Sequence, residues 1–269
     1  MLISVLHRSI RIWTSNNLNR SIRTHTPGRN DVNKIKCVTF DLDDTLWAVH
    51  PVVIKANDLL WAWLEREVPA YTEHYSLSDL AEGSALRRSL LERYPEIAHS
   101  MTETRIRLLE EGMVSVGLTQ QEAESKAAAA FDLFLHHRHA VTPYDQVTEM
   151  LQQLKDQGLL IGALSNGNAE VAKTPLAKWF DFQFNADGVG TAKPHPLMFE
   201  KALEFAAVNA DEVVHIGDHP INDIQAAKEI GMHTIWVNPE GLEWAVEVDA
   251  DWHATMISEI PKIVASLNR

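Results

Sequence analysis

Short apolar runs recur along the chain and are separated by longer stretches of mixed polarity. The apolar runs predict buried strands at 35–40, 159–164, 182–184, 213–216 and 233–237. The stretches between them predict helices at 143–158, 171–180, 196–208 and 222–230. Strands that alternate with helices form a parallel sheet with helices on both faces, so we predict an α/β, Rossmann-like fold.

A long segment after the first predicted strand interrupts this alternation and reads mainly as helix. Val53, Ala56 and Leu60 keep a helical spacing, and Thr119 followed by Glu122 resembles the capping box that opens a helix. We therefore predict three parts, namely an N-terminal extension at 1–33, a catalytic core at 34–47 and 141–269, and an inserted helical cap at 48–140.

Two carboxylates directly follow the first predicted strand. Asp41 and Asp43 are two positions apart, so an extended chain points both toward one face at the carboxyl end of the sheet, where open α/β folds bind ligands. Asp41 can act as a nucleophile, and Asp43 can donate a proton to a leaving oxygen and later take one from water. Taken alone, the motif fits an acidic turn that solvates the strand end equally well.

Three further segments place polar groups at the ends of later strands or before a helix. Ser165 and Asn166 follow the second strand and can hydrogen-bond a phosphate oxygen, and Lys193 is a lone cation in a loop before a helix. Asp218 ends another strand, with Asp223 five residues beyond it. Together with the first motif, these residues favour a metal-assisted phosphoryl-transfer site.

The four motifs, in this order, resemble those of the haloacid dehalogenase superfamily. The resemblance implies that Asp41 attacks the phosphorus and becomes an aspartyl phosphate, while Asp43 protonates the leaving alkoxide and then activates water. It also implies that Ser165 and Asn166 hold a phosphoryl oxygen and that Lys193 neutralises charge on the nucleophile and the phosphate.

The same resemblance implies a Mg²⁺ cofactor. Its protein contacts would be Asp41, the backbone carbonyl of Asp43, and Asp218, with Asp223 supporting them directly or through water. The dehalogenases of this superfamily lack an acid at the position of Asp43, so the resemblance favours a phosphatase over an enzyme that cleaves carbon–halogen bonds.

A closer resemblance covers nearly everything from residue 35 onward. The segments FDLDDTLW, YPEIAHSMTETRIR, LSNGNAE, GTAKPHPLMFEKALE and HIGDHPINDIQAAKEIGM are similar to those of the bacterial flavin mononucleotide (FMN) phosphatases. These enzymes also act on 5-amino-6-(5-phospho-D-ribitylamino)uracil in riboflavin synthesis. The resemblance implies a phosphoric monoester hydrolase for a small-molecule phosphate ester. The alternatives are a phosphatase for a sugar phosphate or nucleotide and, less favoured, a phosphomutase or a haloacid dehalogenase.

The predicted cap would exclude bulk water from the site and add contacts to the substrate. Trp47 directly follows the first motif, so we expect it to line the entrance and bind substrate. Arg105 within the insertion could reach a polar or anionic part of the substrate. Trp61 and Trp63 are two residues apart and cannot share one helix face, so we expect at least one of them in the core.

Composition narrows the setting in which this chemistry would take place. The net charge of −13 argues against a nucleic-acid partner, because phosphate backbones need concentrated Lys and Arg. The single cysteine, Cys37, leaves no intrachain disulfide and favours a reducing compartment. No run reaches the roughly 18 apolar residues of a membrane span. We therefore expect a soluble protein without a membrane or nucleic-acid partner.

The first thirty residues differ from the rest because they contain five arginines and no acidic residue. This composition is typical of an organelle transit peptide, but it also fits a disordered extension or a start codon assigned too far upstream. We expect a cytoplasmic protein, with an organelle matrix as the alternative.

Overall fold

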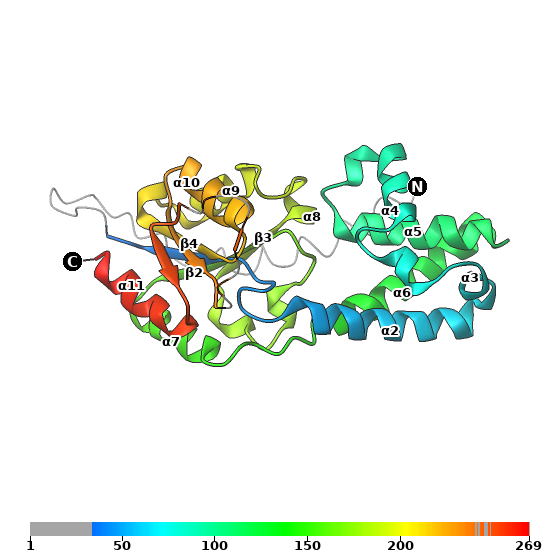
Figure 1. Ribbon diagram of the computed structural model, residues 1–269, viewed down its shortest axis with the longest axis horizontal. Coiled ribbons are helices and arrows are strands. Elements are labelled where there is room, and N and C mark those ends of the chain that lie inside the picture. Colours follow the sequence, from blue (N-terminus) through cyan, green and yellow to red (C-terminus); the bar gives the residue numbers. More distant parts are fainter. Residues whose placement is uncertain (1–33, 240, 242, 245–246, 248, 269) are drawn as a thin grey trace, which may run out of the picture. The chain divides into compact units, whose positions relative to one another are not determined.

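The computed structural model contains a parallel sheet (Figure 1). Its strand order is β3-β2-β1-β4-β5-β6. The strands are β1 (Cys37–Phe40), β2 (Leu160–Ser165), β3 (Phe182–Asn185), β4 (Val213–Gly217), β5 (His233–Val237) and β6 (Trp252–Ala254). The structure describes residues 34–239, 241, 243, 244, 247 and 249–268, so the expectations for 1–33 lie outside the described residues.

Helices cover both faces of the sheet, as the alternating pattern predicts. Figure 1 shows α9 (Leu197–Ala206) and α10 (Ala226–Glu229) on one face, and α7 (Val147–Asp156) and α11 (Ile260–Ser266) on the other. Successive residues of β1 point to opposite faces. Cys37 therefore packs with the α9 and α10 side, and Val38 packs with the α7 and α11 side. Both faces are buried, which is why β1 reads as an unbroken apolar run.

The chain between β1 and α7 forms helices with an apolar cluster of their own. The main helices are α2 (Val49–Glu67), α3 (Pro69–His74), α4 (Ala85–Arg93), α5 (Met101–Ser115) and α6 (Gln120–Arg138). Leu60, Met113 and Phe131 lie in a cluster separate from the two that cover the sheet. The predicted capping box of Thr119 and Glu122 does open α6. The chain from Ile35 onward forms one compact unit, so the cap boundaries at 48 and 140 stay predictions.

Two predicted helices differ from the structure, and both differences involve proline. The segment 171–180 contains two single turns, Val171–Lys173 and Ala177–Trp179, in place of one helix. Pro175 lies between them, and proline lacks an N–H and disfavours helical geometry in the residue before it. Helix α7 begins at Val147 and not at Pro143, because Pro143 instead forms a β-bridge with Trp47.

The edge strand β6 is a feature that the apolar pattern does not predict. It is three residues long, and its middle residue, His253, is exposed. Backbone pairing with β5 defines this strand, and such pairing leaves no periodic signal in so short a segment. Among the described residues, no helix is both long enough and apolar enough to cross a membrane.

Candidate active site

A tight turn after β1 brings the first acidic motif to the carboxyl edge of the sheet. The backbone N–H of Asp41 donates to the carbonyl of Ile216 at 2.8 Å, so the sheet pairing continues into the motif. Asp44 then adopts a left-handed conformation with φ of 58°, which aspartate tolerates better than most residues. Its N–H donates to the carbonyl of Trp47 at 2.8 Å and closes the turn.

Lys193 connects the acidic groups at this edge. Its Nζ donates to Asp41 Oδ1 at 2.8 Å, to Asp223 Oδ1 at 2.6 Å and to the carbonyl of Leu164 at 2.6 Å. The Lys193 side chain is 1% exposed. Burial alone would lower the pKa of its ammonium group, but the carboxylates of Asp223 and Asp41 raise that pKa above its ordinary value. Lys193 is therefore a buried, permanently charged cation beside the predicted nucleophile.

Asn166 holds the backbone of Lys193, and its predicted contact with a phosphoryl oxygen stays a prediction. Its Oδ1 accepts from the N–H of Lys193 at 2.7 Å, and its Nδ2 donates to the carbonyl of Lys193 at 2.9 Å. The amide of Asn166 is thus used in placing the lysine. Ser165 is buried, and its Oγ accepts from the N–H of Gly167 at 3.0 Å, which leaves the hydroxyl proton free to be donated to a phosphoryl oxygen.

Three carboxylates lie close enough together to surround a cation. One oxygen from each of Asp41, Asp218 and Asp223 lies within 4.8 Å of the other two. Asp223 already accepts from Lys193 through Oδ1 and from the N–H of His219 through Oδ2 at 3.0 Å. Asp218 accepts through Oδ1 from Thr45 at 3.1 Å. Among the described residues, Asp41 Oδ2 therefore has no hydrogen-bond donor.

The electrostatics of this cluster suit a divalent cation. Burial raises the pKa of Asp41 well above its ordinary value, although Lys193 opposes the shift. Burial and the nearby charge of Asp223 raise the pKa of Asp218 to about 7. Burial also acts to raise the pKa of Asp223, but Lys193 and His215 together outweigh it and hold that pKa below its ordinary value. A bound cation would stabilise the ionised forms of Asp41 and Asp218, and carboxylate oxygens are the ligands that Mg²⁺ prefers.

Two residues that sequence reasoning missed hold Asp223 in place. A Cβ atom on Gly217 would lie 2.3 Å from Asp223 Cγ, so only glycine permits this approach. His215 Nε2 lies 3.4 Å from Asp223 Oδ1, and its Nδ1 lies 2.8 Å from Thr39 Oγ1. Burial lowers the pKa of His215, so the ring is neutral. A histidine inside an otherwise apolar strand was the available signal.

The side chain of Asp43 contacts two other residues and does not join the carboxylate cluster. Its Oδ1 accepts from Trp47 Nε1 at 2.8 Å, and its Oδ2 accepts from Arg138 Nη2 in an ion pair. Arg138 is the last residue of α6 and is 2% exposed. A Cβ atom on Gly167 would lie 2.6 Å from Asp43 Oδ2, which places this carboxylate beside the loop that begins at Ser165.

The two expected substrate-binding residues differ in their surroundings. Trp47 is 0% exposed, so in this structure its ring is a buried support for Asp43 and does not line an open entrance. Arg105 donates to Asn57 Oδ1 at 2.9 Å, and its guanidinium lies 3.9 Å from the ring centre of Phe134. Burial lowers the pKa of Arg105 to about 10, and the nearby charge of Arg87 adds to the effect. The expected metal contact through the backbone carbonyl of Asp43 stays a prediction.

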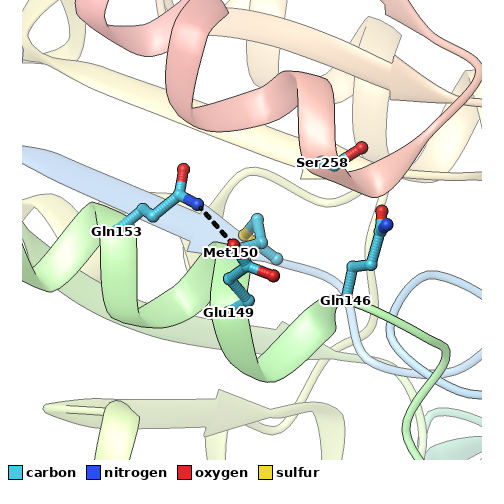
Figure 2. Close-up of a pocket in the computed structure, with 5 residues that line it drawn as sticks. All are labelled: Gln146, Glu149, Met150, Gln153 and Ser258. Carbon is cyan, nitrogen blue, oxygen red and sulfur yellow. Dashed lines mark hydrogen bonds between the residues drawn. The ribbon is translucent and has the colours of Figure 1, made fainter.

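A small pocket lies apart from these residues. Figure 2 shows it between α7 and the turn that precedes α11. The residues that line it are Gln146, Glu149, Met150, Gln153 and Ser258. Gln153 Nε2 donates to Glu149 Oε1 at 3.2 Å along its α7 side. The pocket contains none of the predicted site residues, so we do not assign the chemistry to it.

The chain belongs to the haloacid dehalogenase-like hydrolases, whose family model matches residues 35–231. It is similar to the 5-amino-6-(5-phospho-D-ribitylamino)uracil phosphatase YigB of Escherichia coli K12, with 32% identity over 78% of this chain and 86% of that protein. It is also similar to a glyceraldehyde 3-phosphate phosphatase of Pyrococcus furiosus, with 30% identity over 44% of this chain and 52% of that protein. The expectation of a superfamily phosphatase, a phosphoric monoester hydrolase, is confirmed at this level.

A solved structure supports the fold. The chain is similar to the crystal structure titled 2-haloacid dehalogenase from Pseudomonas syringae pv. tomato DC3000, with 36% identity and a TM-score of 0.80. The match covers 86% of this chain and 99% of that one. The predicted α/β fold is therefore confirmed.

Proposed function

We propose that this enzyme hydrolyses the phosphomonoester of a small metabolite through an aspartyl-phosphate intermediate, with FMN, 5-amino-6-(5-phospho-D-ribitylamino)uracil or both as substrates. One observation carries the chemistry. Lys193 Nζ lies 2.8 Å from Asp41 Oδ1 and 2.6 Å from Asp223 Oδ1, which leaves Asp41 Oδ2 without a donor among the described residues. A buried carboxylate with one oxygen held by a cation and one available suits a positioned nucleophile.

The reaction proceeds in two displacements. Asp41 Oδ2 attacks the phosphorus in line, the bond from phosphorus to the ester oxygen breaks, and Asp43 gives its proton to that oxygen. Asp43 then takes a proton from a water molecule, whose oxygen attacks the phosphorus and releases Asp41 and inorganic phosphate. Lys193 and the Ser165 hydroxyl stabilise the negative charge of the transferring group.

Asp41 and Asp218 would hold a Mg²⁺ ion, together with the backbone carbonyl of Asp43. Asp223 would support this set by keeping Lys193 and the turn at His219 in place. The ion supplies positive charge that offsets the repulsion between the acidic strand ends and a phosphate dianion. The carboxylate oxygens within 4.8 Å of one another support this assignment.

Two arginines in the helical insertion favour a substrate that has a polar or anionic part besides its phosphate. Arg87 and Arg105 are neighbouring cations, and neither has a carboxylate within ion-pair distance among the described residues. Arg87 Nη2 donates to Met101 Sδ at 3.1 Å, a weak acceptor. One turn before Arg105, Thr102 donates to Asp187 of the core at 2.5 Å, so this side of α5 faces the core. The pyrimidinedione of a flavin or of its ribitylamino precursor offers carbonyl acceptors to such groups.

A phosphate-release screen tests this proposal. We expect purified protein with Mg²⁺ to release phosphate from FMN and 5-amino-6-(5-phospho-D-ribitylamino)uracil with kcat/KM at least about tenfold above that for glyceraldehyde 3-phosphate, other sugar phosphates and nucleotides. A sugar phosphate or nucleotide as the best ester would overturn the substrate assignment but keep the chemistry. Because one similar structure is titled a dehalogenase, the panel includes 2-chloropropionate. Halide release without phosphate release from any ester would overturn the proposed reaction.

A further inference from the structure

Two segments connect the helical insertion to the core, one at each end of the insertion. Each segment contributes one side chain that donates a hydrogen bond to Asp43. At the start, Trp47 Nε1 donates to Asp43 Oδ1 at 2.8 Å. At the end, Arg138, 95 residues along the chain from Asp43, forms an ion pair with Asp43 Oδ2. Both oxygens of the proposed acid/base group are therefore held by side chains from the two connections of the insertion.

These connections are themselves joined by the backbone. Trp47 pairs with Pro143 in an antiparallel bridge, and the N–H of Tyr144 donates to the carbonyl of Leu46 at 2.9 Å. Trp47 is 0% exposed and Arg138 is 2% exposed. Neither side chain can leave Asp43 without repacking, so a displacement of the insertion would change the orientation of the carboxylate.

A purely structural role accounts poorly for Arg138. Its Nη1 is buried and, among the described residues, has no hydrogen-bond partner. An unpaired buried donor costs stability, and arginine is seldom buried without full pairing. Gly167 leaves the space that the contact needs, because a Cβ there would lie 2.6 Å from Asp43 Oδ2 and 3.3 Å from Arg138 Nη2.

We propose that Arg138 is a positioning residue which, together with Trp47, aims the carboxyl group of Asp43 at the leaving oxygen of the ester. The two connections of the insertion thereby set the geometry of proton transfer. This inference rests on the proposed phosphatase function and deepens it. In the first displacement, the bond from phosphorus to the ester oxygen breaks while the proton of Asp43 moves to that oxygen. A misdirected Asp43 would force the leaving group to depart as a free anion.

The inference predicts a selective loss that depends on the leaving group. Benzyl phosphate releases a strongly basic alkoxide that needs a proton, whereas p-nitrophenyl phosphate, of similar size, releases a stable phenolate. The ratio kcat/KM reports the steps up to formation of the aspartyl phosphate. For Arg138→Ala we expect kcat/KM to fall about 100-fold on benzyl phosphate and less than about 3-fold on p-nitrophenyl phosphate. For Trp47→Phe, which removes one donor, we expect a fall of about 10-fold on benzyl phosphate alone.

Controls separate this role from folding and from phosphate binding. Arg138→Lys keeps a charged donor and should recover part of the benzyl phosphate activity, and Arg66→Ala, at an exposed position of α2, should match wild type. Equal losses on both esters, a higher KM on both, or no loss would each overturn the inference. Thermal denaturation followed by circular dichroism checks every variant. Wild-type protein that releases phosphate from neither of these two esters nor any ester of the metabolite panel would overturn the proposed function and this inference with it.

Discussion

The carboxyl edge of the sheet and the helical insertion differ in how their buried cations are paired. At the sheet edge, Lys193 is bonded to Asp41, Asp223 and a backbone carbonyl, so every part of the cation is paired. In the insertion, Arg87 and Arg105 have no carboxylate partner among the described residues and rest on a thioether, an amide and an aromatic ring. The paired region holds a geometry ready for reaction. The insertion leaves two arginines without a carboxylate, which fits the role in substrate binding that we propose for it.

Removing the nucleophile should produce the largest effect. This change tests whether the chemistry takes place at the sheet edge. We expect Asp41→Asn to lower kcat at least about 10⁴-fold, because the amide keeps the shape but loses the attacking charge. Asp44→Asn is a matched control in the same turn, since its side-chain oxygen can still accept from the N–H of Val49. Phosphate release measures both variants, with circular dichroism as the folding check. Near-normal turnover by Asp41→Asn would exclude covalent catalysis by this residue.

Removing the metal should also abolish catalysis at the sheet edge, while the insertion stays folded. We expect dialysis against a chelator to abolish phosphate release and added Mg²⁺ to restore it. Asp218→Asn should weaken Mg²⁺ binding, measured by titration calorimetry. Full activity in metal-free protein would contradict the cation site.

The affinity for Mg²⁺ should depend on pH in a defined direction. Burial raises the pKa of Asp218 to about 7. Below that pH the carboxyl group holds a proton that the cation must displace, and above it the group is ionised and ready to bind. We therefore expect Mg²⁺ to bind about tenfold more weakly at pH 6 than at pH 8 in titration calorimetry. Affinity that is equal at both values would contradict competition between a proton and the cation at Asp218.

Changes in the insertion should affect selectivity and spare the chemistry. We expect Arg105→Ala to lower kcat/KM for FMN more than kcat/KM for p-nitrophenyl phosphate. The difference should correspond to about 1 to 3 kcal/mol of transition-state free energy. Arg87→Ala should produce a smaller change of the same kind. Arg105 donates to the side-chain carbonyl of Asn57, which a ring carbonyl of the substrate could replace, whereas Arg87 donates to the thioether of Met101. Arg107→Ala is the matched control, since Arg107 is an exposed arginine of the same helix. Equal losses on both esters would assign Arg105 to the support of the insertion.

The smallest effect concerns stability at the junction of the two regions. His139 follows Arg138, is 6% exposed and has a buried Nε2 without a partner among the described residues. Burial lowers its pKa to about 4. The folded protein therefore keeps this ring neutral while the unfolded chain protonates it, so stability is present above the unfolded pKa and is lost as pH falls.

We expect this protonation to contribute about 2 kcal/mol to the loss of unfolding free energy between pH 7 and pH 5. Urea denaturation at both values measures it, with His139→Gln as the comparison. The variant should lose about 2 kcal/mol less than wild type over this interval. An identical loss in both proteins would mean that His139 is not held neutral by the fold.

The strand-end residues could be predicted from the sequence because each one follows a local pattern. Asp41 and Asp218 directly follow apolar runs, and parallel strands bring such ends to one edge. Arg138 could not be found this way, because its partner lies 95 residues away and no periodicity links the two positions. The two bonds from the Asn166 amide to the Lys193 backbone could not be found this way either, because they join residues 27 positions apart. Polar residue type shows that a group can bind something, and only the tertiary structure shows what it binds.

The pairing of the two connections makes the insertion a replaceable module. Trp47 and Pro143 lie side by side, so the two ends of the insertion meet the core at adjacent positions. This geometry does not depend on the length of the chain between them. Folds tolerate exchange of segments whose ends are adjacent, so helices of another size could be grafted here without changing the strands. A graft that begins after Trp47 and ends before Arg138 would import a new selectivity surface and keep the native proton-transfer geometry. The same enzyme core could then be redirected to other phosphate esters by exchanging one continuous piece of chain.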